Sequence, residues 1–157
     1  MTIKEVCRLC GEENREIINL GESPPANNFL DSQISRIDSF PLILDFCDTC
    51  GGFQLRDCLD KEHLYSNYTY LTPDTNSLTE HYENIVDFLT KNSYIDSSTD
   101  CLEIGSNNGR FLNYLKPHVN TVLGVDPAKN VATYAKQLGI ETIVDFFSKD
   151  TVKKIEN

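Results

Sequence analysis

The most informative stretch of this 157-residue sequence is Asp100-Cys-Leu-Glu-Ile-Gly-Ser-Asn-Asn-Gly109. Its first five residues form a short apolar run that predicts a buried strand, and Gly105 to Gly109 predict a tight turn. A helix is expected next, over 110–116, with Pro117 as its stop. A glycine-containing turn between a strand and a helix is where nucleotide ligands dock in open α/β sheets.

The sequence on either side of this turn continues the alternation. Further strands are expected over 121–125 and 142–147, with a helix over 128–138 between them, and an amphipathic helix over 78–92 precedes the first strand. Alternating strands and helices imply right-handed crossovers and a parallel sheet. Because the alternation stops after about half of an open nucleotide-binding sheet, we expect an incomplete Rossmann-like sheet and the front part of a longer protein.

The first half of the chain has a different composition. It holds five of the six cysteines, and its apolar runs are short, such as Phe29-Leu30 and Leu42-Ile43-Leu44. Short runs broken by glycine and proline predict short strands around a small core, which usually needs a metal or another staple. We therefore expect an α/β protein with a small N-terminal domain over 1–77 and the partial sheet over 78–157.

Two copies of one cysteine motif lie in that first half: Cys7-Arg-Leu-Cys10-Gly11 and Cys47-Asp-Thr-Cys50-Gly51. A gap of two residues lets both sulfurs of a turn reach one cation, and two such turns complete a tetrahedron of thiolates. The glycine after each motif accepts the positive φ that such a turn requires. Cys7, Cys10, Cys47 and Cys50 are therefore predicted to bind a structural Zn²⁺, whereas Cys58 and Cys101 fall outside the pattern.

The kind of nucleotide can be argued from the residues of the glycine turn. A dinucleotide site needs a glycine where this sequence has Asn107, and the acidic Glu103 at the end of the strand would oppose a pyrophosphate. A cationic sulfonium ligand with an amino group suits this turn better, which favours S-adenosylmethionine over NAD. Asp126, at the end of the second strand, can accept both ribose hydroxyls.

The charge balance argues against nucleic acid as a partner. With 14 Lys and Arg against 24 Asp and Glu, the net charge is −10, of which residues 1–77 carry −7 and residues 78–157 carry −3. Non-specific binding to a phosphate backbone needs clustered Lys and Arg. The N-terminus lacks the apolar core of a signal peptide, and no apolar run could cross a bilayer, so we expect a cytoplasmic protein without a membrane partner.

Several motifs together resemble a known family. They are the two cysteine motifs, Pro24-Pro-Ala-Asn-Asn-Phe-Leu30, Tyr68-Thr-Tyr70, Leu102 to Leu112 and Gly124-Val-Asp-Pro-Ala-Lys-Asn-Val131. In this order they resemble the zinc-containing, S-adenosylmethionine-dependent C-methyltransferases that act on nucleotide-linked keto-deoxysugars. The resemblance implies a small zinc domain, a methyltransferase sheet and a further C-terminal domain that is absent here.

The resemblance also implies roles for particular residues. Tyr68 and Tyr70 would face the sugar and are the catalytic candidates, while the family's proposed base lies downstream of this sequence. The cofactor-binding set is Glu103, Gly105, Ser106, Asn107, Gly109 and Asp126. The substrate would be a nucleotide sugar methylated at a carbon next to a ketone, and the chain alone is expected to lack part of the machinery.

Two functions of other classes remain open at this stage. One is a zinc-ribbon interaction module without catalytic activity, and the other is an NAD-dependent sugar oxidoreductase. The three histidines, His63, His81 and His118, have no partner motif and are expected at the surface. Half a sheet leaves its first strand with an unpaired edge, which predicts self-association.

Overall fold

The chain divides into two compact units, Met1–Leu64 and Tyr65–Asn157, in the computed structural model, which describes residues 2–3, 6–28 and 38–155. The division expected at 77/78 falls inside helix α2 (Asn76–Lys91), so the segment that leads into this helix belongs to the second unit. Phe29 and Leu30, part of the family motif in the first half, lie outside the described residues.

The first unit is built of short antiparallel strands. A three-stranded sheet has the order β2-β3-β4, and a small second sheet pairs β1 with β5. The elements are β1 (Thr2–Ile3), β2 (Arg15–Ser23), β3 (Phe40–Phe46), β4 (Phe53–Leu55), β5 (Asp57–Cys58) and α1 (Lys61–Tyr65). The loop between β3 and β4 contains the second cysteine motif, and the first motif precedes β2.

In the part of the first unit that the structure describes, no aliphatic side chain is fully buried. Among the described residues of the first unit, the buried side chains are those of Cys7, Asp45, Cys47 and Gln54. Apolar side chains of the sheet, such as Leu20 and Phe53, are 62% and 63% exposed. Burial of aliphatic groups therefore contributes little to the stability of this unit, and the cysteines occupy the place of a hydrophobic core.

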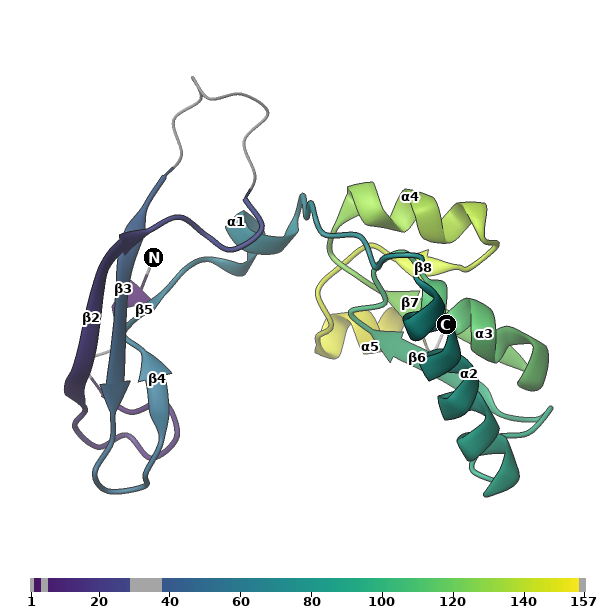
Figure 1. Ribbon diagram of the computed structural model, residues 1–157, viewed down its shortest axis with the longest axis horizontal. Helices are drawn as coiled ribbons and strands as arrows, with labels where there is room; N and C mark the ends of the chain where they lie inside the picture. The colour runs from purple at the N-terminus through teal and green to yellow at the C-terminus, as the bar shows by residue number, and fades with distance from the viewer. Residues whose placement is uncertain (1, 4–5, 29–37, 156–157) are drawn as a thin grey trace. The chain divides into compact units, whose positions relative to one another are not determined.

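The second unit contains a parallel three-stranded sheet in the order β6-β7-β8, with helices beside it (Figure 1). The strands are β6 (Asp100–Ile104), β7 (Thr121–Val125) and β8 (Thr142–Ile143). Besides α2, the helical segments are α3 (Arg110–Leu115), the 3₁₀ turn η1 (Lys116–His118), α4 (Lys129–Gln137) and α5 (Lys149–Ile155). This is the expected mixed α/β fold with a cysteine-containing N-terminal unit.

The core of the second unit lies where α2, α3 and α4 pack against the sheet. Its buried apolar side chains include Val86 of α2, Leu112 and Leu115 of α3, and Ala135 of α4. The half-buried Cys101 packs against this cluster, as expected for a small apolar filler, and burial raises the pKa of its thiol, as does the neighbouring Asp100. These packing contacts hold α3, and with it the turn between β6 and α3, against the rest of the unit.

Two expected elements differ in the structure. The third strand, expected over 142–147, is confined to Thr142–Ile143, because the Asp145 N–H donates to the Ile143 carbonyl at 3.0 Å and turns the chain. The helix expected over 110–116 ends one residue early, at Leu115, and the chain continues as the 3₁₀ turn η1, where the missing N–H of Pro117 costs no helical hydrogen bond.

Candidate functional site

The four motif cysteines converge in the first unit. The sulfur atoms of Cys7, Cys10, Cys47 and Cys50 all lie within 4.8 Å of one another. The Cys7 and Cys50 sulfurs are 3.6 Å apart, and those of Cys10 and Cys47 are 3.5 Å apart. A tetrahedral zinc with Zn–S bonds of about 2.3 Å needs sulfurs about 3.8 Å apart, so the cluster has the dimensions of a Cys₄ zinc site.

The two motifs form equivalent turns. The Gly11 N–H donates to the Cys7 carbonyl at 2.8 Å, and the Gly51 N–H donates to the Cys47 carbonyl at 2.9 Å. Both glycines have positive φ, +83° at Gly11 and +74° at Gly51, as the sequence predicted. The equivalence explains why the same five-residue motif occurs twice, since each copy supplies half of one tetrahedron.

Backbone N–H groups polarise the first sulfur of each turn. The Leu9 N–H donates to the Cys7 sulfur at 3.4 Å. Backbone hydrogen bonds from Cys10 and Leu9 lower the pKa of Cys7 to about 6, and the pKa of Cys47 is lowered chiefly by the backbone N–H of Cys50. Thiolate is the form that ligates a metal, so the chain itself favours the ligating state at these two positions.

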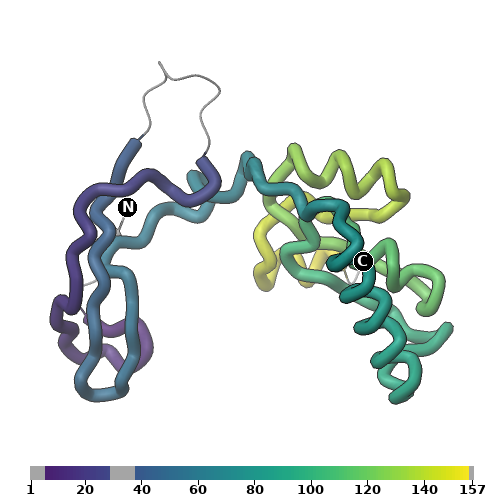
Figure 2. The backbone as a smooth tube through the Cα atoms, in the orientation of Figure 1, coloured from purple at the N-terminus to yellow at the C-terminus, as the bar shows by residue number. Residues whose placement is uncertain are grey.

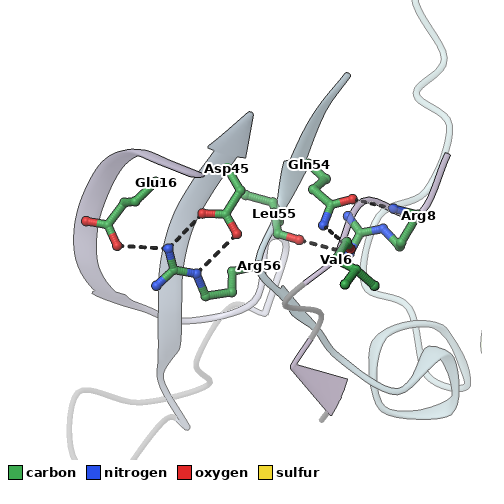
Figure 3. Close-up of polar contacts among 7 residues, drawn as sticks. All are labelled: Val6, Arg8, Glu16, Asp45, Gln54, Leu55 and Arg56. Carbon is green, nitrogen blue, oxygen red and sulfur yellow. Dashed lines mark hydrogen bonds and ion pairs between the residues drawn. The ribbon is translucent and has the colours of Figure 1, made fainter. Parts of the chain in front are cut away.

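Side chains of the sheet hold the first cysteine turn in place (Figure 3). The Gln54 amide accepts from the Arg8 backbone N–H at 2.9 Å and donates to the Val6 carbonyl at 3.1 Å. The Arg8 guanidinium donates to the Leu55 carbonyl and to the Cys58 sulfur, both at 2.9 Å. The two cysteine motifs are thereby linked through β4 by hydrogen bonds as well as by the sulfur cluster.

A buried ion pair lies beside this link, also in Figure 3. The Asp45 side chain is 3% exposed and receives two hydrogen bonds from Arg56, at 2.7 and 3.1 Å. Arg56 also pairs with Glu16 at 2.9 Å, so one guanidinium joins β2, β3 and the residue after β4. Removing Arg56 alone would leave the buried Asp45 charge without a partner and would destabilise this unit.

In the second unit the glycine turn has the geometry that its sequence predicts. Gly105 has φ +74°, and a Cβ built on it would meet no atom within 4 Å, so the space above the turn is open. A Cβ on Gly109 would lie 3.0 Å from the Ala135 Cβ and 3.1 Å from the Ile140 Cβ. Gly105 thus leaves room for a ligand at the backbone, whereas Gly109 allows close packing of α3.

Ser106 is turned into the protein. Its side chain is 3% exposed, and a Cβ on Gly124 of β7 would lie 2.4 Å from the Ser106 Oγ. Neither this hydroxyl nor that of Thr142, which also faces Gly124, has a protein partner. The side chain of Ser106 therefore packs under the turn and β7, and only its backbone lies along the turn.

Glu103 and Asp126 are the two carboxylates of the turn. One oxygen of Glu103, Oε2, is buried without a hydrogen-bond partner, and burial followed by the charge of Asp126 raises the pKa of Glu103 to about 7. Asp126 accepts from the backbone N–H groups of Asn107 at 2.8 Å and Ala128 at 2.9 Å. Asp126 is thus already held by the turn, and Glu103 is the carboxylate that lacks a partner.

The side chain of Asn107 contacts another segment of the same unit. Its amide nitrogen donates to the Tyr70 carbonyl at 3.0 Å, and its amide oxygen accepts from the Thr72 backbone N–H at 3.0 Å. Residues 68–72, which we call the tyrosine strap, are in this way fixed to the glycine turn. The backbone path from the strap into α2 can be followed in Figure 2.

The strap has a second anchor that the sequence did not reveal. Asn130, in the first turn of α4, accepts from the Tyr68 backbone N–H at 3.1 Å and donates to the Tyr68 carbonyl at 2.6 Å. The strap presents Tyr68 half-buried and Tyr70 47% exposed, with their ring centroids 6.3 Å apart. The structure therefore brings both tyrosines to the unit that contains Glu103, Gly105 and Asp126.

The three histidines are exposed, as expected, and none belongs to either group of site residues. His63 stacks edge-on against Phe40, with ring centroids 5.8 Å apart. In the described part of the chain, no helix is both long enough and apolar enough to cross a membrane.

Comparison with known proteins finds similarities over both units. Residues 7–65 match the family model described as "Putative zinc binding domain". Over 152 residues the chain is 30% identical to C-methyltransferase NovU from Streptomyces niveus, an alignment that covers 95% of this chain and 36% of that protein. The two similarities predicted from the motifs, of the N-terminal part to a zinc-binding domain and of the chain to a C-methyltransferase, are confirmed. The chain spans about a third of the length of this curated relative.

Among solved structures, the YcgJ protein from Bacillus subtilis is similar at a TM-score of 0.36 and 18% identity. The similarity covers 43% of this chain and 30% of that one.

Proposed function

We propose that this chain binds Zn²⁺ in its first unit and S-adenosylmethionine in its second, and that it serves C-methylation of a nucleotide-linked keto-deoxysugar. The similarity to a C-methyltransferase supports the reaction class. The sulfur geometry supports a zinc that is structural, since four thiolates leave no open coordination position for water or substrate. The nucleotide-linked keto-deoxysugar is the substrate class that the resemblance of the sequence motifs implies.

The observation that carries the proposal is the unpartnered oxygen of Glu103. A buried carboxylate oxygen without a hydrogen bond is costly, and the cost is relieved when a cationic donor binds beside it. The open space above Gly105 leaves room for such a ligand next to the turn. The ammonium and sulfonium charges of S-adenosylmethionine suit this environment, whereas a pyrophosphate would add two negative charges beside Glu103 and Asp126.

Asn107 argues against the dinucleotide alternative. A pyrophosphate-binding turn needs a glycine at this position so that the backbone can approach the ligand. Here the position has a side chain whose amide nitrogen and oxygen are both engaged with the strap. A nicotinamide cofactor would have to displace these contacts, which disfavours the oxidoreductase.

In the proposed reaction a bound S-adenosylmethionine supplies an electrophilic methyl group on sulfur. A general base, which the resemblance places downstream of the third strand, would take the proton next to the sugar ketone, and the negative charge would collect on the ketone oxygen. The neighbouring carbon would then bond to the methyl carbon as the methyl–sulfur bond breaks, and the neutral thioether would leave. A hydroxyl of Tyr68 or Tyr70 would donate a hydrogen bond to that oxygen, while Asp126 would orient a ribose. Alignment of the two reacting carbons then supplies most of the acceleration.

Calorimetric titration of the zinc-loaded chain with S-adenosylmethionine and, separately, with NADH tests the proposal. We expect binding of the first only, weakened about 10- to 100-fold by Glu103→Ala because a charge-assisted contact is lost. Glu83→Ala, at an exposed position of α2, is the matched control and should bind like the wild type. Binding of NADH instead would indicate an oxidoreductase, and binding of neither would favour an interaction module.

A further inference from the structure

The backbone of the tyrosine strap is held by side-chain amides in place of a neighbouring strand. Its contacts to Asn130 and Asn107 fall on Tyr68, Tyr70 and Thr72, which are alternate residues. In an extended chain, alternate residues direct their backbone N–H and C=O groups to the same side, as in the ladder of a β-sheet. The strap therefore follows the pattern of an edge strand whose partner is a set of asparagine side chains.

Both the oxygen and the nitrogen of the Asn107 amide hold the strap in this arrangement. Its oxygen accepts from the backbone N–H of Thr72 at 3.0 Å, from the Thr72 hydroxyl at 3.3 Å and from the Asn108 N–H at 2.9 Å. Its nitrogen donates to Tyr70, and the Asn108 amide adds a hydrogen bond to the Thr72 carbonyl at 2.9 Å. The Asn107 side chain thus holds the strap through both the oxygen and the nitrogen of its amide.

The same residue connects the strap to the carboxylate of the turn. The Asn107 backbone N–H donates to Asp126 at 2.8 Å while its side chain holds residues 70 and 72. Just beyond the strap, Asp74 pairs with Arg110, the first residue of α3. The glycine turn, Asp126 and the strap therefore form one hydrogen-bonded assembly.

We infer that Asn107 and Asn130 are positioning residues, whose amides fix the strap across the glycine turn and so set where Tyr68 and Tyr70 stand. The inference rests on the proposed function, because it makes the strap one wall of the methyl-donor site. A ligand that contacts the turn and Asp126 would bind an assembly that includes the strap. It should therefore stabilise the closed strap against opening.

Chymotrypsin provides the test, because it cleaves after Tyr68, Tyr70 and Leu71 only when the strap opens. Cleavage is followed by mass spectrometry, with cleavage after Phe88 in α2 as an internal reference for global unfolding. We expect Asn130→Ala to speed cleavage in the strap about tenfold, because two hydrogen bonds are lost and cleavage follows the open population. Asn84→Ala, at an exposed position of α2, should leave the rate unchanged.

Asn130→Asp separates hydrogen bonding from packing. Aspartate has the same shape and can accept from the Tyr68 N–H, but it cannot donate to the Tyr68 carbonyl and places a carboxylate against it. We expect this variant to be cleaved at least as fast as Asn130→Ala. Cleavage at the wild-type rate in either variant would overturn the inference.

Saturating S-adenosylmethionine should slow cleavage of the wild-type strap, and calorimetry on the same samples reports binding independently. Binding without any change in strap cleavage would overturn the inference and leave the proposed function standing. Absence of binding would instead refute the proposed function. The cleavage rates of the Asn130 variants without ligand would still test whether Asn130 anchors the strap.

Discussion

Glu103 is a residue whose burial costs the folded state stability. Its pKa is raised to about 7, first by burial and then by the charge of Asp126. An acid whose pKa is higher in the folded state binds more protons there than in the unfolded state between about pH 4.5 and 7. The contribution of Glu103 to the free energy of unfolding therefore falls as the pH rises from about 4.5 to 7, and it stays low at higher pH.

Replacing this carboxyl should remove the pH-dependent penalty. We expect Glu103→Gln to raise the Tm at pH 8 by about 2–4 °C, corresponding to about 1 kcal/mol because solvent screens a part-buried group. The difference from wild type should shrink toward pH 5, where Glu103 is protonated in the folded state. Thermal unfolding from pH 5 to 8 measures it, with the exposed Glu83→Gln as control. A Glu103→Gln variant no more stable than wild type at pH 8 would show that the carboxylate already has a partner.

Residues whose role depends on nearby sequence could be identified in advance. The cysteine motifs define their own turns, so spacing and the following glycine were enough to predict Cys7, Cys10, Cys47 and Cys50 as one cluster. The anchoring of the strap was not predictable in this way, because Asn130 and Tyr68 are 62 positions apart in sequence. An asparagine at the start of a helix is too common a feature to indicate such a contact.

At the scale of elements, prediction succeeded where apolar runs are flanked by turn residues. Strands β6 and β7 have the expected bounds, and α2 and α4 lie within two residues of theirs. Strand β8 is shorter than its apolar run, because Val144 and Phe147 continue the hydrophobic pattern beyond Ile143, where the ladder ends and the chain turns toward Asp145. Hydrophobicity alone does not reveal where a ladder of hydrogen bonds ends.

Strand β6 is the element from which we predict self-association. Within the described residues it pairs only with β7, and its Leu102 and Ile104 side chains are 43% and 58% exposed. An open edge next to exposed apolar side chains favours pairing with a second copy. We expect light scattering after size exclusion to show a mass that rises with concentration, and Leu102→Lys to reduce it. Phe88→Lys, at an exposed position of α2, should leave the mass unchanged from wild type. A wild-type chain that is monomeric at every concentration would contradict the prediction.

At the scale of the whole molecule, the two units are stabilised by different means. The second has a cluster of buried apolar side chains, including Leu112 and Ile140. In the described part of the first unit, buried positions hold only Cys7, Cys47, Asp45 and Gln54. A metal bound by the four cysteine thiolates would replace aliphatic burial there, and the free energy of metal binding would then be free energy of folding.

Removing the metal should therefore unfold one unit and leave the other intact. With a strong zinc chelator, we expect amide hydrogens of β2, β3 and β4 to lose nearly all protection from exchange, whereas those of β6, β7 and α4 keep theirs. Cys50→Ser should reproduce the loss without chelator, because it removes one ligand of the tetrahedron. Cys58→Ser is the matched control, since Cys58 lies outside the cluster. Elemental analysis of this variant should still find one zinc per chain. Full protection of β2–β4 in metal-free protein would mean that the Asp45–Arg56 pair and the Gln54 contacts suffice to hold this unit together.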